Sequence, residues 1–288
     1  MPLHTSVLAI EALDALAIVP DGTYVDATFG AGGHTRLILE RVGPRGRVIA
    51  FDADPLASSL APDDSRLTLI HANFRALAGE LAQRSIASVD GILYDLGVSS
   101  MQFDDGARGF SFRSDAPLDM RLDPTQGETA AEFIVSRDEV ELADAIFRFG
   151  EERNSRRIAR ALKAKLPRTT GELAAIVAGT VHVRGKRERV HPATKTFQAL
   201  RISVNDELGA LRESLDAAAN VVRPDGRIAV ISFHSLEDRI VKLFFREDAR
   251  LQPLTRKPIV PSDEEILSNP RARSAKLRVA TVESEVAA

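Results

Sequence analysis

The 288-residue chain contains no cysteine, no tryptophan and only 2 tyrosines. The absence of cysteine excludes disulfides, thiolate zinc sites, iron–sulfur clusters and any cysteine nucleophile. No apolar run approaches the roughly 20 residues that span a bilayer. The N-terminal sequence MPLHTSVLAIEAL lacks the basic start and the small-residue cleavage site of a signal peptide. We therefore expect a cytoplasmic protein with no membrane span.

Lysine is absent from residues 1–150, where 12 arginines face 23 acidic residues. Residues 151–288 carry 26 basic and 18 acidic residues, so the two parts differ strongly within a total charge of −3. This asymmetry is compatible with a polyanion partner for the second part, but on charge alone a solvated helical surface is slightly favoured. The basic residues form three clusters: Arg153, Arg156, Arg157, Arg160, Lys163 and Lys165; Arg184, Lys186, Arg187 and Arg189; Arg271, Arg273, Lys276 and Arg278.

Short apolar runs alternate with helical patterns through the first hundred residues. Strands are expected at 24–29, 47–51, 67–71 and 89–94, with helical segments between them. This alternation predicts an α/β fold with parallel strands and right-handed crossovers, in which ligands bind beyond the carboxyl ends of the strands. A fifth strand is expected after a Pro-Asp-Gly turn, and the sequence KLRVATV is expected to add an edge strand.

Small and acidic residues follow these expected strands. The first is followed by the turn Gly30-Ala31-Gly32-Gly33, where glycine allows positive φ and close approach of a ligand. Asp52 follows the second strand about 20 residues beyond Gly32, the spacing at which a carboxylate binds ribose hydroxyls. Phe74 and Asp95 follow the third and fourth strands. Structural alternatives are a plain tight turn for the glycines, helix caps for Asp52 and Asp95, and a core position for Phe74.

The residues around the glycine turn restrict the ligand. A dinucleotide fingerprint needs a third glycine where this chain has Thr35, and no lysine follows the glycines as in a Walker A motif. Asp26 is unfavourable beside a pyrophosphate but suits a cationic group. S-adenosylmethionine has an ammonium, a sulfonium and a ribose but no phosphate. The turn therefore favours this nucleoside, with a nicotinamide dehydrogenase as the disfavoured alternative.

The central part of the chain does not continue the alternation of strands and helices. Residues 97–127 form a long segment rich in Gly, Ser, Asp and Pro, which we interpret as a functional loop or lid. Capping boxes are expected at Ser136-x-x-Glu139 and Thr169-x-x-Glu172, and one long helix at 196–222. We expect a discontinuous methyltransferase domain over 1–106 and 213–288, and an inserted helical domain over 107–212 that recognises RNA.

Longer motifs extend over nearly the whole chain. In order they are DATFGAGGHT, DGILYDLGVSSMQ, RGFSF, PLDMR, FGEE, FQALRISVNDEL, SFHSLEDRIVK and NPRARSAKLR. With these motifs the chain closely resembles the bacterial ribosomal small-subunit RNA methyltransferase H family. It departs from the family at Met101, where many members have Pro, and at Thr35, where many have Ser.

The resemblance implies a Rossmann-like S-adenosylmethionine-dependent methyltransferase with an inserted all-helical domain. It implies methylation of the exocyclic N4 of a cytidine in 16S rRNA near the decoding site, with 16S rRNA or the small ribosomal subunit as partner. No metal ligands are expected. Carried over motif by motif, the cofactor contacts are Gly32, Gly33, His34, Asp52, Phe74, Asp95 and Gln102.

The proton acceptor is not identified by the resemblance. Cytosine N4 is a poor nucleophile because its lone pair is delocalised, so an acceptor near N4 would help. Asp119 and His234 are our catalytic candidates, with Asp95 as a third. The structural alternatives are a loop-ordering salt bridge from Asp119 to Arg121 or Arg113, a strand-end histidine, and a cofactor contact. Phe103, Phe110 and Phe112 could stack on a base or anchor the loop.

Two other functions are compatible with these residues. One is an S-adenosylmethionine-dependent methyltransferase acting on another substrate. The other is a non-catalytic RNA-binding assembly factor that retains the cofactor pocket. Competition between 16S rRNA and small amines in a transfer assay separates the first from the expected activity. Production of S-adenosylhomocysteine excludes the second.

Overall fold

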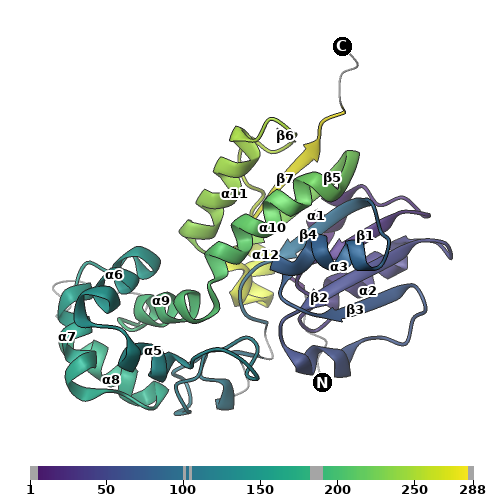
Figure 1. The fold of residues 1–288 in the computed structure, drawn as a ribbon. Helices are drawn as coiled ribbons and strands as arrows, with labels where there is room; N and C mark the ends of the chain where they lie inside the picture. The colour runs from purple at the N-terminus through teal and green to yellow at the C-terminus, as the bar shows by residue number, and fades with distance from the viewer. Residues whose placement is uncertain (1–5, 100–101, 104–105, 182–190, 285–288) are drawn as a thin grey trace. The chain divides into compact units, whose positions relative to one another are not determined.

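The computed structural model describes residues 6–99, 102–103, 106–181 and 191–284. Two compact units are present, one formed by residues 1–97 and 208–288 and the other by residues 98–207. The first contains a sheet covered by helices and the second is helical, as Figure 1 shows. Within the described segments, no helix has both the length and the apolar character needed to cross a membrane.

The sheet unit contains seven strands in the order β3-β2-β1-β4-β5-β7-β6. Strands β1 to β5 are parallel, and β7 is antiparallel to both β5 and β6. The chain reverses its direction of strand addition between β1 and β4, so their carboxyl ends flank the crevice in which such sheets bind ligands. The strands are β1 (Thr23–Asp26), β2 (Arg47–Asp52), β3 (Leu67–His71), β4 (Val89–Asp95), β5 (Val222–Ser232), β6 (Leu251–Pro253) and β7 (Lys276–Val282).

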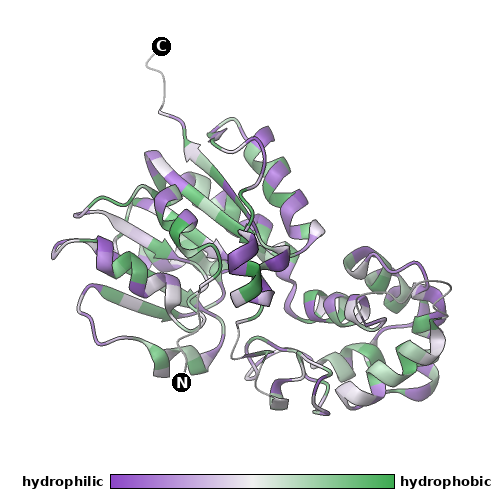
Figure 2. Ribbon diagram, turned by 180° about the vertical axis from the view of Figure 1, so that it is seen from behind, coloured by the Kyte–Doolittle hydropathy of each residue, from purple (hydrophilic) through white to green (hydrophobic). Residues whose placement is uncertain are grey.

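Side chains alternate between two apolar layers, one on each face of the sheet. Val25, Ile49 and Ile92 pack beneath α3 (Leu77–Gln83), α10 (Glu207–Val221) and α11 (Ser235–Glu247). Tyr24, Val48 and Leu93 pack on the opposite face with α1 (Ala9–Leu16), α2 (Gly33–Arg41) and η4 (Pro270–Ser274). Figure 2 shows the resulting pattern, with hydrophobic strands inside and helices that are hydrophilic on their outer sides. The remaining elements of this unit are η1 (Pro55–Leu60), η2 (Phe74–Ala76) and α12 (Asp263–Ser268).

The helical unit has its own apolar core. Its elements are η3 (Gly106–Arg108), α5 (Ala130–Ser136), α6 (Glu139–Gly150), α7 (Ser155–Lys165), α8 (Thr170–Thr180) and α9 (Thr194–Asn205). Leu142 and Ile146 of α6 pack with Ile158 and Leu162 of α7 and with Leu200 of α9.

Several expectations about individual elements were wrong. The cap of α6 is Asp138, which accepts hydrogen bonds from the N–H groups of Val140 and Glu141, whereas Ser136 ends α5. The expected helix over 196–222 is two helices, because Asp206 adopts a left-handed conformation with φ 45° between α9 and α10. The strand KLRVATV is not at an edge, since β6 pairs with its outer side. The expected capping box at Thr169 is confirmed.

Gly150 allows α6 and α9 to pack closely, and Gly150→Ala is expected to destabilise the helical unit. A Cβ at this position would lie 2.5 Å from the backbone carbonyl oxygen of Lys195, so the helices must separate. The cost is about 1–3 kcal/mol. Gly179→Ala in α8 is the matched control, because its Cβ would meet nothing within 4 Å and alanine favours the helix by about 0.5–1 kcal/mol. Hydrogen exchange of the α6 and α9 amides measures the stability of the helical unit in both variants. Equal protection in Gly150→Ala and Gly179→Ala contradicts the prediction.

Candidate cofactor and active site

The turn between β1 and α2 brings bare backbone to the carboxyl edge of the sheet. Gly30 and Gly32 have φ values of 55° and 76°, which glycine adopts without strain. A Cβ on Gly32 would lie 2.7 Å from the ring of Phe29, so a side chain there is both strained and obstructed. The turn therefore requires glycine at position 32, and α2 begins directly after it at Gly33.

Asp26 holds this turn together from inside the protein. It is fully buried, and its Oδ2 accepts a 2.6 Å hydrogen bond from the hydroxyl of Thr35. Its Oδ1 accepts a 3.1 Å hydrogen bond from the N–H of Thr28. Burial raises the pKa of Asp26 despite these bonds. The expected direct contact with a cationic ligand group is therefore replaced by a structural contact that joins β1 to α2.

Asp52 ends β2 and faces the same turn. Its Oδ2 accepts a 2.7 Å hydrogen bond from the N–H of Gly30, and its Oδ1 accepts a 2.8 Å hydrogen bond from the N–H of Asp54. Each oxygen retains a second lone pair, so two ribose hydroxyls can still donate to it. Asp52 does not cap the following helical turn, because Asp54 does so through the N–H of Leu56. The helix-cap alternative for Asp52 is therefore wrong.

Asp95 at the end of β4 faces His34 at the start of α2. His34 lies in the first turn of α2, is 4% exposed, and places Nε2 3.4 Å from Asp95 Oδ2. Burial by itself lowers the pKa of His34, but the carboxylates of Asp95 and Asp26 outweigh it and the pKa is raised. The backbone N–H of Asp95 donates a 2.7 Å hydrogen bond to the hydroxyl of Thr28. The ring of His34 thus faces carboxylates.

Phe74 follows β3 as the first residue of η2. Its ring packs edge-on against the buried ring of Tyr94, with centroids 5.8 Å apart and planes at 86°. It is partly buried against the core layer that contains Ile49 and Ile92. This packing agrees with the alternative that Phe74 has a core position, and its contact with adenine stays a prediction.

Gln102 and Asp119 belong to the helical unit. Gln102 is 5% exposed, and its Oε1 accepts a 2.9 Å hydrogen bond from the N–H of Ser99. Both oxygens of Asp119 accept hydrogen bonds from the guanidinium of Arg121, at 2.9 and 2.8 Å. Burial opposes this effect, yet Arg121 keeps the pKa of Asp119 below its usual range. The arrangement favours the loop-ordering salt bridge, and the catalytic role of Asp119 stays a prediction.

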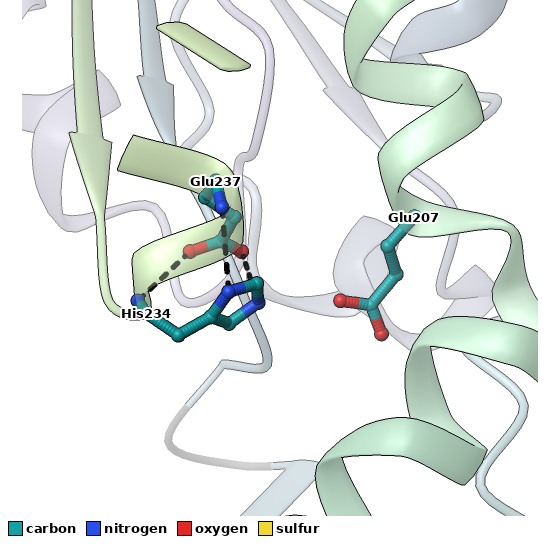
Figure 3. Close-up of side chains that lie close together, drawn as sticks. All are labelled: Glu207, His234 and Glu237. Carbon is teal, nitrogen blue, oxygen red and sulfur yellow. Dashed lines mark hydrogen bonds and ion pairs between the residues drawn. The ribbon is translucent and has the colours of Figure 1, made fainter. Parts of the chain in front are cut away.

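His234 is the N-cap of α11 and forms a capping box with Glu237, as Figure 3 shows. Its Nδ1 accepts a hydrogen bond from the N–H of Glu237 at 3.4 Å, and Nε2 lies 3.2 Å from Glu237 Oε1. Glu237 Oε2 in turn accepts a 2.8 Å hydrogen bond from the N–H of Phe233. The spacing His-x-x-Glu before a helix was the sequence signal for this structural role. The geometry favours that role, and a catalytic role for His234 stays a prediction.

The parallel order 3-2-1-4-5, the glycine turn and the carboxylate at the end of β2 define the class as a Rossmann-like S-adenosylmethionine-dependent methyltransferase. The sequence model of the MraW methylase family matches residues 1–283. The chain belongs to the MraW methylase family. The expected fold class and cofactor are thereby confirmed.

The sequence of one named relative agrees with this assignment. A protein named ribosomal RNA small subunit methyltransferase H, from Chromobacterium violaceum, is 51% identical over 304 residues, which are 96% of this chain and 94% of the relative. An rRNA methylase structure from Streptococcus thermophilus has 8% identity and a TM-score of 0.46, covering 98% of this chain and 99% of the other. The N-methyltransferase NodS from Bradyrhizobium japonicum, in complex with S-adenosylhomocysteine, has 8% identity and a TM-score of 0.44, covering 96% and 86%.

Binding of S-adenosylmethionine is expected to weaken in mild acid because of Asp52. Burial raises the pKa of Asp52 to about 6, against the effect of its two backbone hydrogen bonds. The carboxylate is therefore ionised at pH 8 and mostly protonated at pH 5, where it has lost its charge. We expect the dissociation constant to rise about tenfold between pH 8 and pH 5. Calorimetry at a series of pH values measures this, and an equally steep dependence in Asp52→Asn contradicts it.

Proposed function

We propose that this protein transfers the methyl group of S-adenosylmethionine to the exocyclic N4 of a cytidine in small-subunit ribosomal RNA, near the decoding site. The observation that carries the proposal is the 51% identity, over almost the full length of both chains, to a ribosomal RNA small subunit methyltransferase H. A ribosomal substrate also agrees with the expected cytoplasmic location.

The carboxyl edge of the sheet fits the cofactor. In the proposed arrangement the backbone at Gly32 and Gly33 approaches the cofactor, the carboxylate of Asp52 accepts from its ribose hydroxyls, and Phe74 contacts the adenine. His34, Asp95 and Gln102 are the remaining proposed cofactor contacts. Two observations support the fit. The φ of Gly32 is one that favours glycine, so the backbone there has no side chain, and each oxygen of Asp52 keeps a second lone pair. The bound cofactor supplies an electrophilic methyl group on sulfur.

The protein's own contribution is to position the reacting atoms and to remove a proton. An exocyclic amine loses a proton as it gains a methyl group, so the site needs an acceptor but no covalent adduct. Methylation at carbon 5 would proceed through attack at carbon 6, usually by a thiolate, and this chain has no cysteine. The chain composition thus supports amine chemistry.

The helical unit is proposed to contact RNA through phosphate-binding side chains. Arg153, Arg156 and Arg157 lie exposed at the beginning of α7. Lys163, in the same sequence cluster, instead donates to three backbone carbonyls at the end of α5, including that of Arg137 at 2.7 Å. The cluster Arg184 to Arg189 lies outside the described residues.

The aromatic residues of the long loop differ in the contacts that they make. Phe110 is buried in the helical core, and Phe112 packs on His191 and Phe197 with ring centroids 4.6 and 5.0 Å apart. The guanidinium of Arg113 lies 5.8 Å from the ring centroid of Phe103. These contacts favour anchoring of the loop by Phe110 and Phe112, and stacking of a base on Phe103 stays a prediction.

Transfer of a tritiated methyl group tests the function. The full chain is incubated with labelled S-adenosylmethionine and with unmethylated small subunits, free 16S rRNA or small amines. Label in N4-methylcytidine after nuclease digestion is the expected result. Label on another nucleoside overturns the N4 assignment, label on small amines alone supports another methyltransferase, and no S-adenosylhomocysteine in any reaction supports the assembly factor.

A further inference from the structure

The turn η4 lies at the carboxyl edge of the sheet, the same edge as the candidate cofactor site. β7 runs antiparallel to β5, and its first residue, Lys276, pairs with Ser232, the last residue of β5. Only Ala275 separates η4 from β7, so η4 lies at the carboxyl end of β5. A nucleic acid whose base reaches the cofactor approaches this edge, because the strand ends form the cofactor site.

The backbone of η4 is anchored in the apolar layer that contains α1. Ala272 and Ala275 are both buried in this layer. The N–H of Ala275 donates a 2.8 Å hydrogen bond to the carbonyl of Ala272, whose own N–H donates a 3.0 Å hydrogen bond to the carbonyl of Asn269. Ala272 stands between two exposed residues, Arg271 and Arg273. An anchored backbone thus carries both arginines, which lowers the entropic cost of binding a ligand through them.

The C-terminal basic cluster divides into an internally paired part and an exposed part. Asp238 of α11 accepts hydrogen bonds from Arg278 at 2.7 Å and from Lys276 at 3.1 Å. These two basic residues therefore hold α11 against β7. Arg271 and Arg273, on η4, are exposed. The part of the cluster that a ligand can reach is therefore the pair of arginines on η4.

The remainder of the sheet unit does not attract a polyanion. The sequence of this unit contains 20 basic and 24 acidic residues. At the carboxyl edge, Asp52 and Asp95 end the strands β2 and β4. A phosphate group that approaches these carboxylates is repelled unless positive charge lies nearby. The arginines of η4 place two positive charges at this edge.

We propose that Arg271 and Arg273 bind phosphate groups of the substrate RNA on either side of the nucleotide that is methylated. This inference rests on the proposed function. A nucleotide within an RNA chain has a phosphate on each side, so a base that enters the cofactor site brings two phosphates to the edge of the sheet. The planar guanidinium of arginine donates two parallel hydrogen bonds to a phosphate, which lysine cannot do. The sheet unit thus supplies an RNA contact of its own, in addition to that proposed for the helical unit.

The double variant Arg271→Ala with Arg273→Ala tests this contact in the full chain. Binding of free 16S rRNA is measured by filter retention over a series of salt concentrations, with S-adenosylhomocysteine present. The slope of log K against log salt is expected to become shallower by about 1.4, because each phosphate contact to a single strand contributes about 0.7. The same loss makes the dissociation constant about tenfold higher at physiological salt. Affinity for S-adenosylmethionine is expected to stay within about twofold, since Asp52 and the glycine turn are unchanged.

Arg256→Ala with Lys257→Ala is the matched control, because it removes the same charge from exposed residues of the same unit. The segment 254–259 runs beside β7, so these residues lie away from the carboxyl edge. The control is expected to keep the wild-type slope. Equal slopes in the two double variants, or a wild-type slope after loss of Arg271 and Arg273, overturn the inference.

Methyl transfer by the wild type separates this inference from the proposed function. Transfer to 16S rRNA by the wild type, together with an unchanged slope in the η4 variant, overturns the RNA contact alone. Absence of transfer by the wild type overturns the proposed function and with it the inference.

A second measurement uses the wild-type protein and does not depend on the folding of a variant. Phenylglyoxal modifies exposed arginines, and mass spectrometry of the digested protein locates the modified residues. Bound 16S rRNA is expected to protect Arg271 and Arg273 at least about fivefold, because a guanidinium that holds a phosphate is shielded from the reagent. Arg256 is expected to keep its reactivity. Equal modification of Arg271 and Arg273 with and without RNA overturns the inference.

Discussion

Asp52→Ala is expected to weaken binding of S-adenosylmethionine about 100- to 1,000-fold. The ionised carboxylate can accept a hydrogen bond from each of two ribose hydroxyls, and hydrogen bonds to charged groups contribute about 1.5–3 kcal/mol each. The variant also removes the acceptor for the N–H groups of Gly30 and Asp54, so the glycine turn loses its fixed position. Calorimetric titration at pH 8, where the carboxylate is ionised, measures the loss.

Asp90→Ala is the matched control for this experiment. Asp90 lies near the opposite end of β4 and likewise accepts a backbone hydrogen bond, from the N–H of Thr23 at 2.7 Å. It also pairs with Arg223 at 2.6 Å. Its removal is expected to lower the melting temperature but to leave the dissociation constant within about twofold. Wild-type affinity in Asp52→Ala, or equal losses in both variants, would refute the ribose assignment.

Asp238→Ala is expected to destabilise the sheet unit by about 3 kcal/mol, which lowers its melting temperature by about 6–12 °C. The carboxylate of Asp238 in α11 accepts a 2.7 Å hydrogen bond from Arg278 and a 3.1 Å hydrogen bond from Lys276, both on β7. The side chain of Arg278 is only 9% exposed, so the variant leaves a nearly buried cation without its partner. Thermal unfolding followed by circular dichroism measures the change.

The pH dependence of this contribution follows from the direction of the pKa shift. Burial acts to raise the pKa of Asp238, but Arg278 and Lys276 outweigh it and the pKa is lowered. A depressed folded-state pKa means that the stabilisation is present above the unfolded value of about 3.9 and is lost as the pH falls through the folded value. The difference between wild type and Asp238→Ala should therefore be constant from pH 6 to 8.

Asp216→Ala provides the comparison for a surface ion pair. Asp216 is 64% exposed and pairs with Arg250, which also pairs with Asp248. Exposed pairs contribute about 0–1 kcal/mol, and Arg250 keeps a second partner in this variant. A shift in melting temperature as large as that of Asp238→Ala would show that burial of Arg278 is not the cause.

Local patterns predicted most of the sheet correctly. The strands from β1 to β4 and the glycine turn follow from apolar runs and small residues that are adjacent in the chain. The short helices were harder, because neighbouring residues compete for the same role. Asp138 accepts from two N–H groups and displaces Ser136 as the cap of α6. Likewise, the periodicity of α9 continues into α10, and only the left-handed conformation of Asp206 separates them.

The sequence by itself determined the class of chemistry: glycines at the end of the first strand, a carboxylate after the second, no phosphate-binding lysine and no thiol. Those features act through residue type and spacing along the chain. Only the tertiary structure decided which carboxylate does what. Asp26 is occupied from inside, Asp52 retains lone pairs, and Asp95 faces His34. These differences arise because burial and hydrogen-bond partners are set by residues far apart in the chain, which no local pattern contains.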